Sequence, residues 1–414
     1  MTSEYNNNYC LSYLEQLPYE EIDVRITGDA RFSDQKCTPD LVCFIADCIL
    51  NTSCKDRLFT VKDLWQTDYF CQNMQAIFRK PDPNDPRARH EYDKVIPQNL
   101  KLLGYARVLN VIRRGKRLFF EVRHFDMLEW LARNDRNAFT FLNFYYERVL
   151  KASGFYKYMD AYKEQVQQDP NRRTIRAAKK ELYQNFHTFI SDCTPTHSKT
   201  DTDRMFHKIL NPFAYKNRIP GSTHEIPMFY DLMYNDENWR DINKTKEQTR
   251  QENAGVQAES TPEQLEIFTT YYVGKAIRLI KKLHFKSEVP DQWSNGDATH
   301  VHHIFPKADF PQFAAYVENL ILLTATQHYT QAHPNNNTHL IDPDYQKVCL
   351  LCKADSIEKN IRLNGEKYYR KDLFLEVVNT GLSINLTEDQ TFADIKNCII
   401  RRYNGFDLTP SMYV

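Results

Sequence analysis

Apolar residues recur at helical spacing along several stretches of this chain, and the first clear stretch begins near residue 38. Residues 38–40 (Thr-Pro-Asp) have the order of a helix N-cap, a proline at the first helical position and an acid in the first turn. Apolar positions then repeat every three or four residues from Leu41 to Leu50. Similar patterns predict a short helix after Thr60 and a third helix from Tyr69 to Phe78.

After residue 98 the pattern changes from helical to alternating. A helical segment from Gln98 to Leu103 is predicted to end at Gly104, because glycine readily adopts the left-handed conformation that closes many helices. Residues 105–112 and 118–123 then have the composition of two strands, with apolar and polar positions alternating in the second. A basic turn joins them, so the sequence predicts a β-hairpin.

Three helices followed by a hairpin is the chain order of a winged-helix domain, in which a helix enters a DNA groove and the hairpin tip holds phosphates. Under this interpretation the DNA-binding residues of the tip are Arg113, Arg114, Lys116 and Arg117. The alternative is a plain α+β domain whose basic turn is solvated.

The middle of the chain is helical. Residues 125–166 carry an aromatic and aliphatic stripe that indicates a buried core. The next predicted helix carries five cations, of which those at positions 172, 176, 179 and 180 share one face: Arg172, Arg173, Arg176, Lys179 and Lys180. Like charges at this spacing repel, and a DNA backbone would relieve the repulsion; a solvated face is the alternative. Residues 235–261 are rich in charges and amides and predict a polar linker.

These patterns predict a multidomain α+β protein. Residues 1–130 would form a winged-helix-like DNA-recognition domain, and residues 131–260 a helical connecting or recognition region that ends in the linker. Residues 262–414 would form a C-terminal domain that opens with a capped helix at residues 261–263. Further helices are predicted at Asp344–Ile361, near Asp372–Val378 and at Phe392–Tyr403.

Composition narrows the class of protein. The 414 residues are 42% hydrophobic and 26% charged, as in soluble globular proteins. The chain has no apolar run of the length that spans a membrane, and its N-terminal sequence lacks the regions of a signal peptide, so we expect a cytoplasmic protein with no membrane partner. The 54 basic and 54 acidic side chains argue against indiscriminate coating of nucleic acid, but they leave selective DNA binding open.

The ten cysteines are expected to be reduced in that compartment. Cys349 and Cys352 form a lone CxxC pair. A structural zinc site usually needs four ligands, and no second pair follows, so core packing is the favoured role.

Six of the 13 histidines lie between His300 and His339. Burying histidine without partners is costly, so packing alone explains this density poorly. His302 and His303 lie in a predicted strand at 299–305, residues 319–323 predict a second strand, and a helix that carries His328 follows. Adjacent strand residues point to opposite sides, so one histidine of the pair can bind a metal while the other faces an attacking water.

The order strand, loop, strand, helix, with His-His, Asn and His at these spacings, resembles the HNH motif of ββα-metal nucleases and covers residues 299–333. The resemblance implies that His302 and His328 bind the metal and that His303 is the general base. It also implies that Asn319 holds the base or completes the finger.

The third metal ligand departs from the family pattern. The family often has a ligand four residues after the helix histidine, where this chain has Ala332. His333 lies one residue further, about 100° away around an α-helix, and is predicted as the third ligand if the helix unwinds before Pro334. In the loop between the strands, Lys307 is a candidate DNA contact. Imidazole ligands accept several divalent ions; we expect Mg²⁺ as the most available, with Mn²⁺ or another divalent transition metal as the alternative.

Over most of its length the chain resembles bacterial type II restriction endonucleases of the HNH class, most of all those of type IIS. The segments that carry this likeness are DQKCTPDLVCFIADCI at 34–49, the hairpin after it, and HHIFPK, NLILLT and QH in the finger. The resemblance implies site-specific cleavage of double-stranded DNA in a bacterial cytoplasm, with a cognate modification methyltransferase as genetic partner. One HNH site cuts one strand, so double-strand cleavage implies a homodimer on DNA or two successive nicks.

Two other functions fit the same residues. One is a non-specific or nicking HNH nuclease of a phage or toxin system. The other is a DNA-binding regulator whose histidines form a structural metal site.

Overall fold

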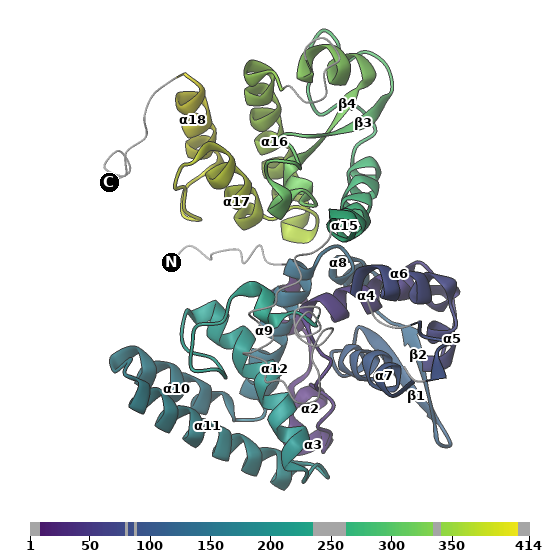
Figure 1. Cartoon of the computed structure of the whole chain (residues 1–414), viewed down its shortest axis with the longest axis vertical. Helices are drawn as coiled ribbons and strands as arrows, with labels where there is room; N and C mark the ends of the chain where they lie inside the picture. The colour runs from purple at the N-terminus through teal and green to yellow at the C-terminus, as the bar shows by residue number, and fades with distance from the viewer. Residues whose placement is uncertain (1–8, 79–81, 87–88, 235–261, 334–340, 405–414) are drawn as a thin grey trace. The chain divides into compact units, whose positions relative to one another are not determined.

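The computed structural model describes residues 9–78, 82–86, 89–234, 262–333 and 341–404 (Figure 1). Within these residues most of the chain is helical, and four strands form two separate antiparallel pairs, β1–β2 and β3–β4. The predicted mixed α+β class is therefore confirmed. The predicted linker at 235–261 lies outside the described residues.

The chain divides into two compact units. One comprises residues 10–264, and the other comprises residues 265–414 with residues 1–9. This division does not separate residues 1–130 from 131–260, and that finer boundary stays a prediction.

The first unit is built around α4, whose residues from Pro39 to Ile49 are all buried. Helix α4 packs against α7, α8 and α9. The helices and strands of this unit are α1 (Tyr9–Glu15), α2 (Tyr19–Ile22), α3 (Val24–Thr27), α4 (Pro39–Leu50), α5 (Val61–Trp65), α6 (Asp68–Phe78), α7 (Arg89–Tyr105), β1 (Leu109–Arg114), β2 (Arg117–Val122), α8 (Phe125–Leu131), α9 (Asp135–Ala152), α10 (Tyr156–Gln168), α11 (Arg172–Cys193) and α12 (Lys199–Asn217).

The predicted end of a helix at Gly104 is wrong. Helix α7 continues to Tyr105, with Gly104 inside it. The glycine serves close packing instead of a helix end, because a Cβ there would lie 2.2 Å from Cγ2 of Val111 on β1. The left-handed residue is Arg107, with φ of 61°, and the Val108 N–H donates to the Leu103 carbonyl at 2.9 Å as in a Schellman motif. The first strand consequently begins at Leu109 rather than at residue 105.

The predicted hairpin is present, with Arg114 opposite Arg117 at its tip. Gly115 takes a φ of 61° in the two-residue turn. A third piece of extended chain joins the sheet, because Phe59 exchanges two backbone hydrogen bonds with Phe120 of β2, at 2.9 and 2.7 Å. The order of elements is therefore α4, an extended residue, α5, α6, α7 and a hairpin.

The second unit surrounds β4, in which every residue is buried. The three predicted helices after the His-rich segment are confirmed as α16, α17 and α18. The elements of this unit are α15 (Pro262–Leu283), β3 (Ala298–His303), β4 (Leu320–Thr324), the π-helical turn η6 (Gln327–Ala332), α16 (Pro343–Asn364), α17 (Lys371–Leu382) and α18 (Phe392–Tyr403).

A buried ion pair supports β4. Glu288 accepts a hydrogen bond from the Leu322 N–H at 2.9 Å, and its carboxylate lies 3.0 Å from the Lys353 ammonium. Both side chains are almost fully buried, and Lys353 also donates to the Tyr369 hydroxyl at 3.0 Å. Removing one partner of such a pair would leave a buried charge, so the pair fixes the position of β4.

Glu318 lies just before β4 and is 1% exposed. Its Oε1 accepts from the Arg370 N–H at 2.9 Å, and its Oε2 has no hydrogen-bond partner among the described residues. Burial raises the pKa of this carboxyl to about 7. The folded chain therefore keeps the proton over a pH range in which the unfolded chain has already released it.

We expect folding stability to fall as the pH rises from 4.5, the ordinary pKa of a glutamate side chain, to about 7. Because the folded-state pKa is raised, the contribution of Glu318 is complete below that window and is lost across it, at about 1.4 kcal/mol per pH unit. Urea unfolding at a series of pH values measures the slope of the free energy of unfolding against pH. Glu318→Gln should remove this part of the slope, whereas Glu388→Gln at an exposed site should not. Equal slopes for Glu318→Gln and the parent chain would contradict the assignment.

Candidate metal and catalytic site

The His-His pair lies at the end of β3, which pairs with β4 so that His302 stands opposite Ile321 and His303 opposite Leu320. The predicted strands at 299–305 and 319–323 correspond to β3 and β4 within two residues at each end. The pair is thus anchored to a strand of which every residue is buried.

Asn319 fixes the chain just beyond the histidine pair. It is fully buried, its Oδ1 accepts from the Phe305 N–H at 2.9 Å, and its Nδ2 donates to the Phe305 carbonyl at 3.0 Å. Neither bond involves the His303 ring. Of its two predicted roles, these bonds are consistent with completing the finger rather than with holding the His303 ring.

The helix predicted after Thr324 opens with a reciprocal cap. The Gln327 N–H donates to Thr324 Oγ1 at 3.2 Å, and the Thr324 N–H donates to Gln327 Oε1 at 3.0 Å, as in a capping box. The Gln327 amide also donates to the Val289 carbonyl and to Asp291, each at 2.8 Å. Gln327 is not among the residues predicted for the site, although the sequence pattern Thr-x-x-Gln is a signal that identifies it.

His333 reaches the site through a change of helix type. Residues 327–332 form a π-helical turn, and the His333 N–H donates to the His328 carbonyl five residues earlier, at 3.2 Å. In a π-helix the repeating bond joins residues i and i+5, so the two histidines share one face. The unwinding expected before Pro334 is thus a π-helical turn, which brings His333 to the side of His328.

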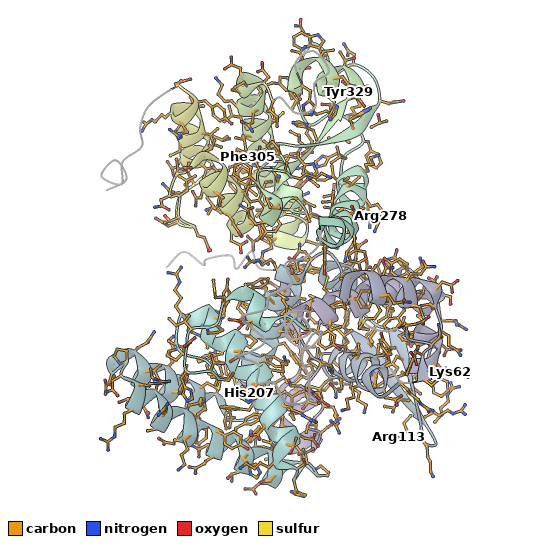
Figure 2. All side chains as sticks on the ribbon, in the orientation of Figure 1. Lys62, Arg113, His207, Arg278, Phe305 and Tyr329 are labelled. Carbon is orange, nitrogen blue, oxygen red and sulfur yellow. The ribbon has the colours of Figure 1, made fainter. Side chains whose placement is uncertain are left out.

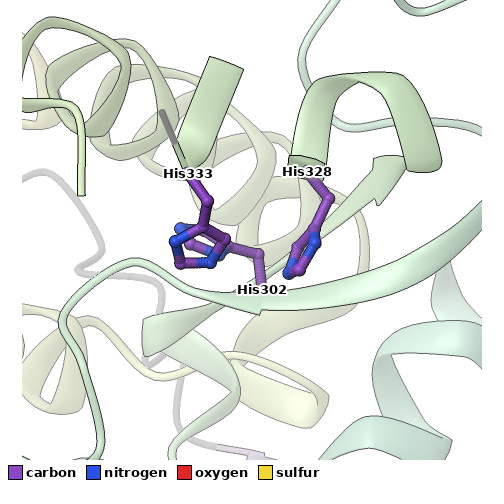
Figure 3. A group of neighbouring side chains, drawn as sticks. All are labelled: His302, His328 and His333. Carbon is purple, nitrogen blue, oxygen red and sulfur yellow. The ribbon is translucent and has the colours of Figure 1, made fainter. Parts of the chain in front are cut away.

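His302, His328 and His333 converge (Figure 3). One ring nitrogen of each lies within 4.8 Å of the others, and no other group of at least three close metal-ligand side chains occurs in the described part of the chain. His302 and His333 are 3% and 6% exposed, and His328 is half-buried. The three residues predicted as metal ligands are thus brought together.

The electrostatics of the cluster disfavour the protonated form of His302 and His328. Burial and the neighbouring imidazoles lower the pKa of His302 well below its ordinary value, and burial and His333 lower the pKa of His328 to about 4. Nδ1 of His328 is buried and has no hydrogen-bond partner among the described residues. Neutral imidazoles with an unsatisfied buried nitrogen suit a divalent cation, because a metal ligand must be deprotonated.

His303 follows His302 on β3, and its ring is held separately from the cluster. Its Nε2 donates to the Ala314 carbonyl at 2.9 Å, which leaves Nδ1 as the proton acceptor of the neutral ring. Burial lowers the pKa of His303, and the Lys307 ammonium lowers it further. Lys307 itself is exposed. The ring is therefore oriented, neutral and close to a surface cation.

The predicted DNA-binding residues of the first unit are exposed. Arg113, Arg114, Lys116 and Arg117 lie at the outer end of the β1–β2 hairpin, where Figure 2 labels Arg113. Arg172, Arg173 and Arg176 lie in the first two turns of α11, where the helix dipole disfavours cations. Both sets belong to the unit of residues 10–264, whereas the clustered histidines belong to the other unit.

All ten cysteines lie among the described residues as free thiols. Burial raises the pKa of Cys349 well above its ordinary value and raises that of Cys352 to about 11, so both thiols stay protonated. Their burial is consistent with the predicted role in core packing.

In none of the described helices are the length and the apolar character great enough to cross a membrane. No family model, curated protein or solved structure matches this chain.

Proposed function

We propose that this chain is a metal-dependent endonuclease of the HNH, ββα-metal type that hydrolyses phosphodiester bonds of double-stranded DNA. The observation that carries the proposal is the convergence of three histidine nitrogens within 4.8 Å, next to an oriented fourth histidine on the same strand. His302 and His303 lie on β3, His328 lies in η6, and His333 follows η6 directly, so the four come from the strand and helical segments to which the resemblance assigns them.

The number of ligands favours catalysis over a purely structural metal. Structural zinc sites are closed by four protein ligands, whereas catalytic sites keep a position open for water or substrate. The group here has three histidines among the described residues, and none of its members is a carboxylate or thiolate. Three ligands among the described residues leave room for a water or a substrate, as the nuclease proposal requires; His339 lies outside the described residues.

The residues divide the chemistry between them. His303 accepts a proton at Nδ1 from the attacking water, while its Nε2–H remains bonded to the Ala314 carbonyl. The exposed Lys307 ammonium attracts the phosphate. His302, His328 and His333 would hold the divalent cation, which supplies charge neutralisation at the phosphate and at the departing oxygen.

The donor set also bears on the choice of metal. Imidazole nitrogen suits zinc, nickel and similar ions better than magnesium, which prefers oxygen ligands. We keep Mg²⁺ as the ion expected on grounds of availability, with Mn²⁺ or another divalent transition metal as the alternative that the ligands favour.

Digestion of a long linear DNA and of a supercoiled plasmid tests the proposal, with protein that has been freed of metal by a chelator and then given each divalent ion in turn. Discrete bands would support a site-specific restriction enzyme, a smear would support a non-specific nuclease, and nicked plasmid would support a nicking enzyme. Absence of cutting with every divalent ion would overturn the nuclease proposal.

We assign DNA recognition to the first unit. The order α4, extended residue Phe59, α5, α6, α7 and hairpin is consistent with a winged helix, and the tip cations are exposed. Selective recognition at a distance from the cutting site fits a type IIS-like restriction enzyme. A cognate methyltransferase and a homodimer on DNA, or two successive nicks, are parts of the same proposal.

Arg113→Gln combined with Lys116→Gln should weaken DNA binding and lower the slope of log affinity against log salt by about 2, because two phosphate contacts are lost. Fluorescence anisotropy with a duplex at several salt concentrations measures this slope. Lys359→Gln with Arg362→Gln, exposed cations on α16, is a matched control that should leave it unchanged. An unchanged slope in the hairpin variant would contradict contact of the tip with phosphate.

A further inference from the structure

The three clustered histidines are unequally accessible. His302 and His333 are almost completely buried, whereas His328 is half-buried. His328 is therefore the most accessible of the three ligands, and we take its side as the approach for a ligand of the metal.

Two further side chains border His328. The His300 ring lies 5.2 Å from the His328 ring and is inclined to it by 33°. Tyr329 lies edge-on to both rings, with ring-centroid distances of 4.7 Å to His328 and 5.1 Å to His300, and it is 41% exposed. Figure 2 labels Tyr329 in the second unit. His300 and Tyr329 together form what we call the rim of the site.

His300 is held in a defined orientation. It precedes His302 by two residues on β3 and therefore points to the same side of the strand. Its Nδ1 lies 3.0 Å from the Thr299 hydroxyl. A hydroxyl can donate its proton to Nδ1, and in that tautomer Nε2 carries the hydrogen and becomes a donor.

We propose that His300 is a substrate-binding residue, whose Nε2–H donates to a non-bridging oxygen of a phosphate at the rim. His300 is not a member of the group whose nitrogens lie within 4.8 Å of one another, so we assign it to the phosphate and not to the metal. Tyr329 positions the ring by its edge contact. The inference rests on the proposed function, since it names the group that a DNA substrate would meet at the rim.

Cobalt(II) provides a readout that does not depend on DNA cleavage. Its visible absorption reports the ligands of the metal, and inorganic phosphate added to the cobalt-loaded full chain should perturb that spectrum. His300→Phe keeps a ring against His328 and Tyr329 but removes the donor, so phosphate affinity should fall about tenfold. His300→Gln restores an N–H donor and should recover part of the affinity. His197→Gln, at an exposed histidine of the other unit, is the control.

The outcomes separate the two proposals. The assignment is supported if His300→Phe has the same cobalt spectrum as the parent chain before phosphate is added and then binds phosphate more weakly. Equal phosphate affinity in all variants, or a changed spectrum before phosphate is added, overturns it. A protein that binds cobalt and shows the His300 effect but cuts no DNA contradicts only the nuclease. A protein that takes up no cobalt contradicts both the metal site and the role of His300.

Discussion

Replacing His303 with alanine is expected to lower the rate of DNA cleavage by about 10²- to 10⁴-fold, the usual contribution of a general base. The ring is positioned for this role, because its Nε2 is occupied by the Ala314 carbonyl and Nδ1 is its proton acceptor. Burial and Lys307 lower its pKa, so the ring is neutral and able to accept a proton at pH 7. Single-turnover cleavage of a radiolabelled duplex at saturating enzyme measures the chemical step.

Binding measurements distinguish loss of chemistry from loss of structure. His303→Ala should keep its affinity for DNA and for the metal, because the ring belongs neither to the three-histidine group nor to the hairpin. The Ala314 carbonyl loses its donor, at a cost of about 1 kcal/mol of stability that thermal unfolding would detect. His197→Ala, at an exposed histidine, controls for the composition change. Cleavage at the parental rate by His303→Ala would remove His303 from the mechanism.

Local sequence patterns predict the elements of the site because the relevant contacts are local. Spacing and capping residues place the His-His pair, Asn319 and His328 on a strand, a second strand and a helix, and the structure has the two strands within two residues of their predicted bounds. The reciprocal cap of Thr324 and Gln327 depends on four consecutive residues. Such features require no knowledge of the rest of the fold.

Other features depend on contacts between distant residues, and local patterns do not predict them. Gly104 lies within α7, where its lack of a side chain makes room for Val111 of the hairpin, a contact between residues that belong to different elements. Asn319 bonds to the Phe305 backbone rather than to the His303 ring, a choice that depends on how the loop between the strands closes. Helical propensity alone cannot distinguish an α-helical from a π-helical turn at residues 327–332, since tertiary contacts decide it.

The π-helical turn has contacts that favour it at both ends. At its start Gln327 is tied to Val289 and Asp291. At its end the Ala332 carbonyl accepts from the Asp342 N–H at 3.2 Å, and the Ala332 side chain is 1% exposed. These contacts hold Ala332 in the core and leave the next residue, His333, facing the metal-ligand cluster.

Exchanging the two residues, by Ala332→His with His333→Ala, is therefore expected to lower metal affinity by on the order of 100-fold or more. The loss should exceed the 10–100-fold typical of removing a supporting residue, because a direct ligand is lost. The exchange keeps the composition and restores the four-residue spacing of the family pattern, but it puts the histidine in the core position. Competition with a chromophoric chelator measures the affinity for Zn²⁺ or Co²⁺.

For a deletion of the exposed Thr330, the same geometry predicts that metal affinity is largely kept, in contrast to the exchange. It also shortens the spacing between the two histidines to four residues, but it removes the extra residue that the π-helical turn accommodates. The turn can then become α-helical, in which residues i and i+4 share a face, and His333 should still reach the cluster. We expect the metal affinity to stay within about tenfold of that of the parent chain. A tenfold loss is the smallest that is typical of removing a residue that supports a metal ligand. If the deletion abolished binding as completely as the exchange does, the π-helical turn would be required for more than spacing, and the ligand role of His333 would need another explanation.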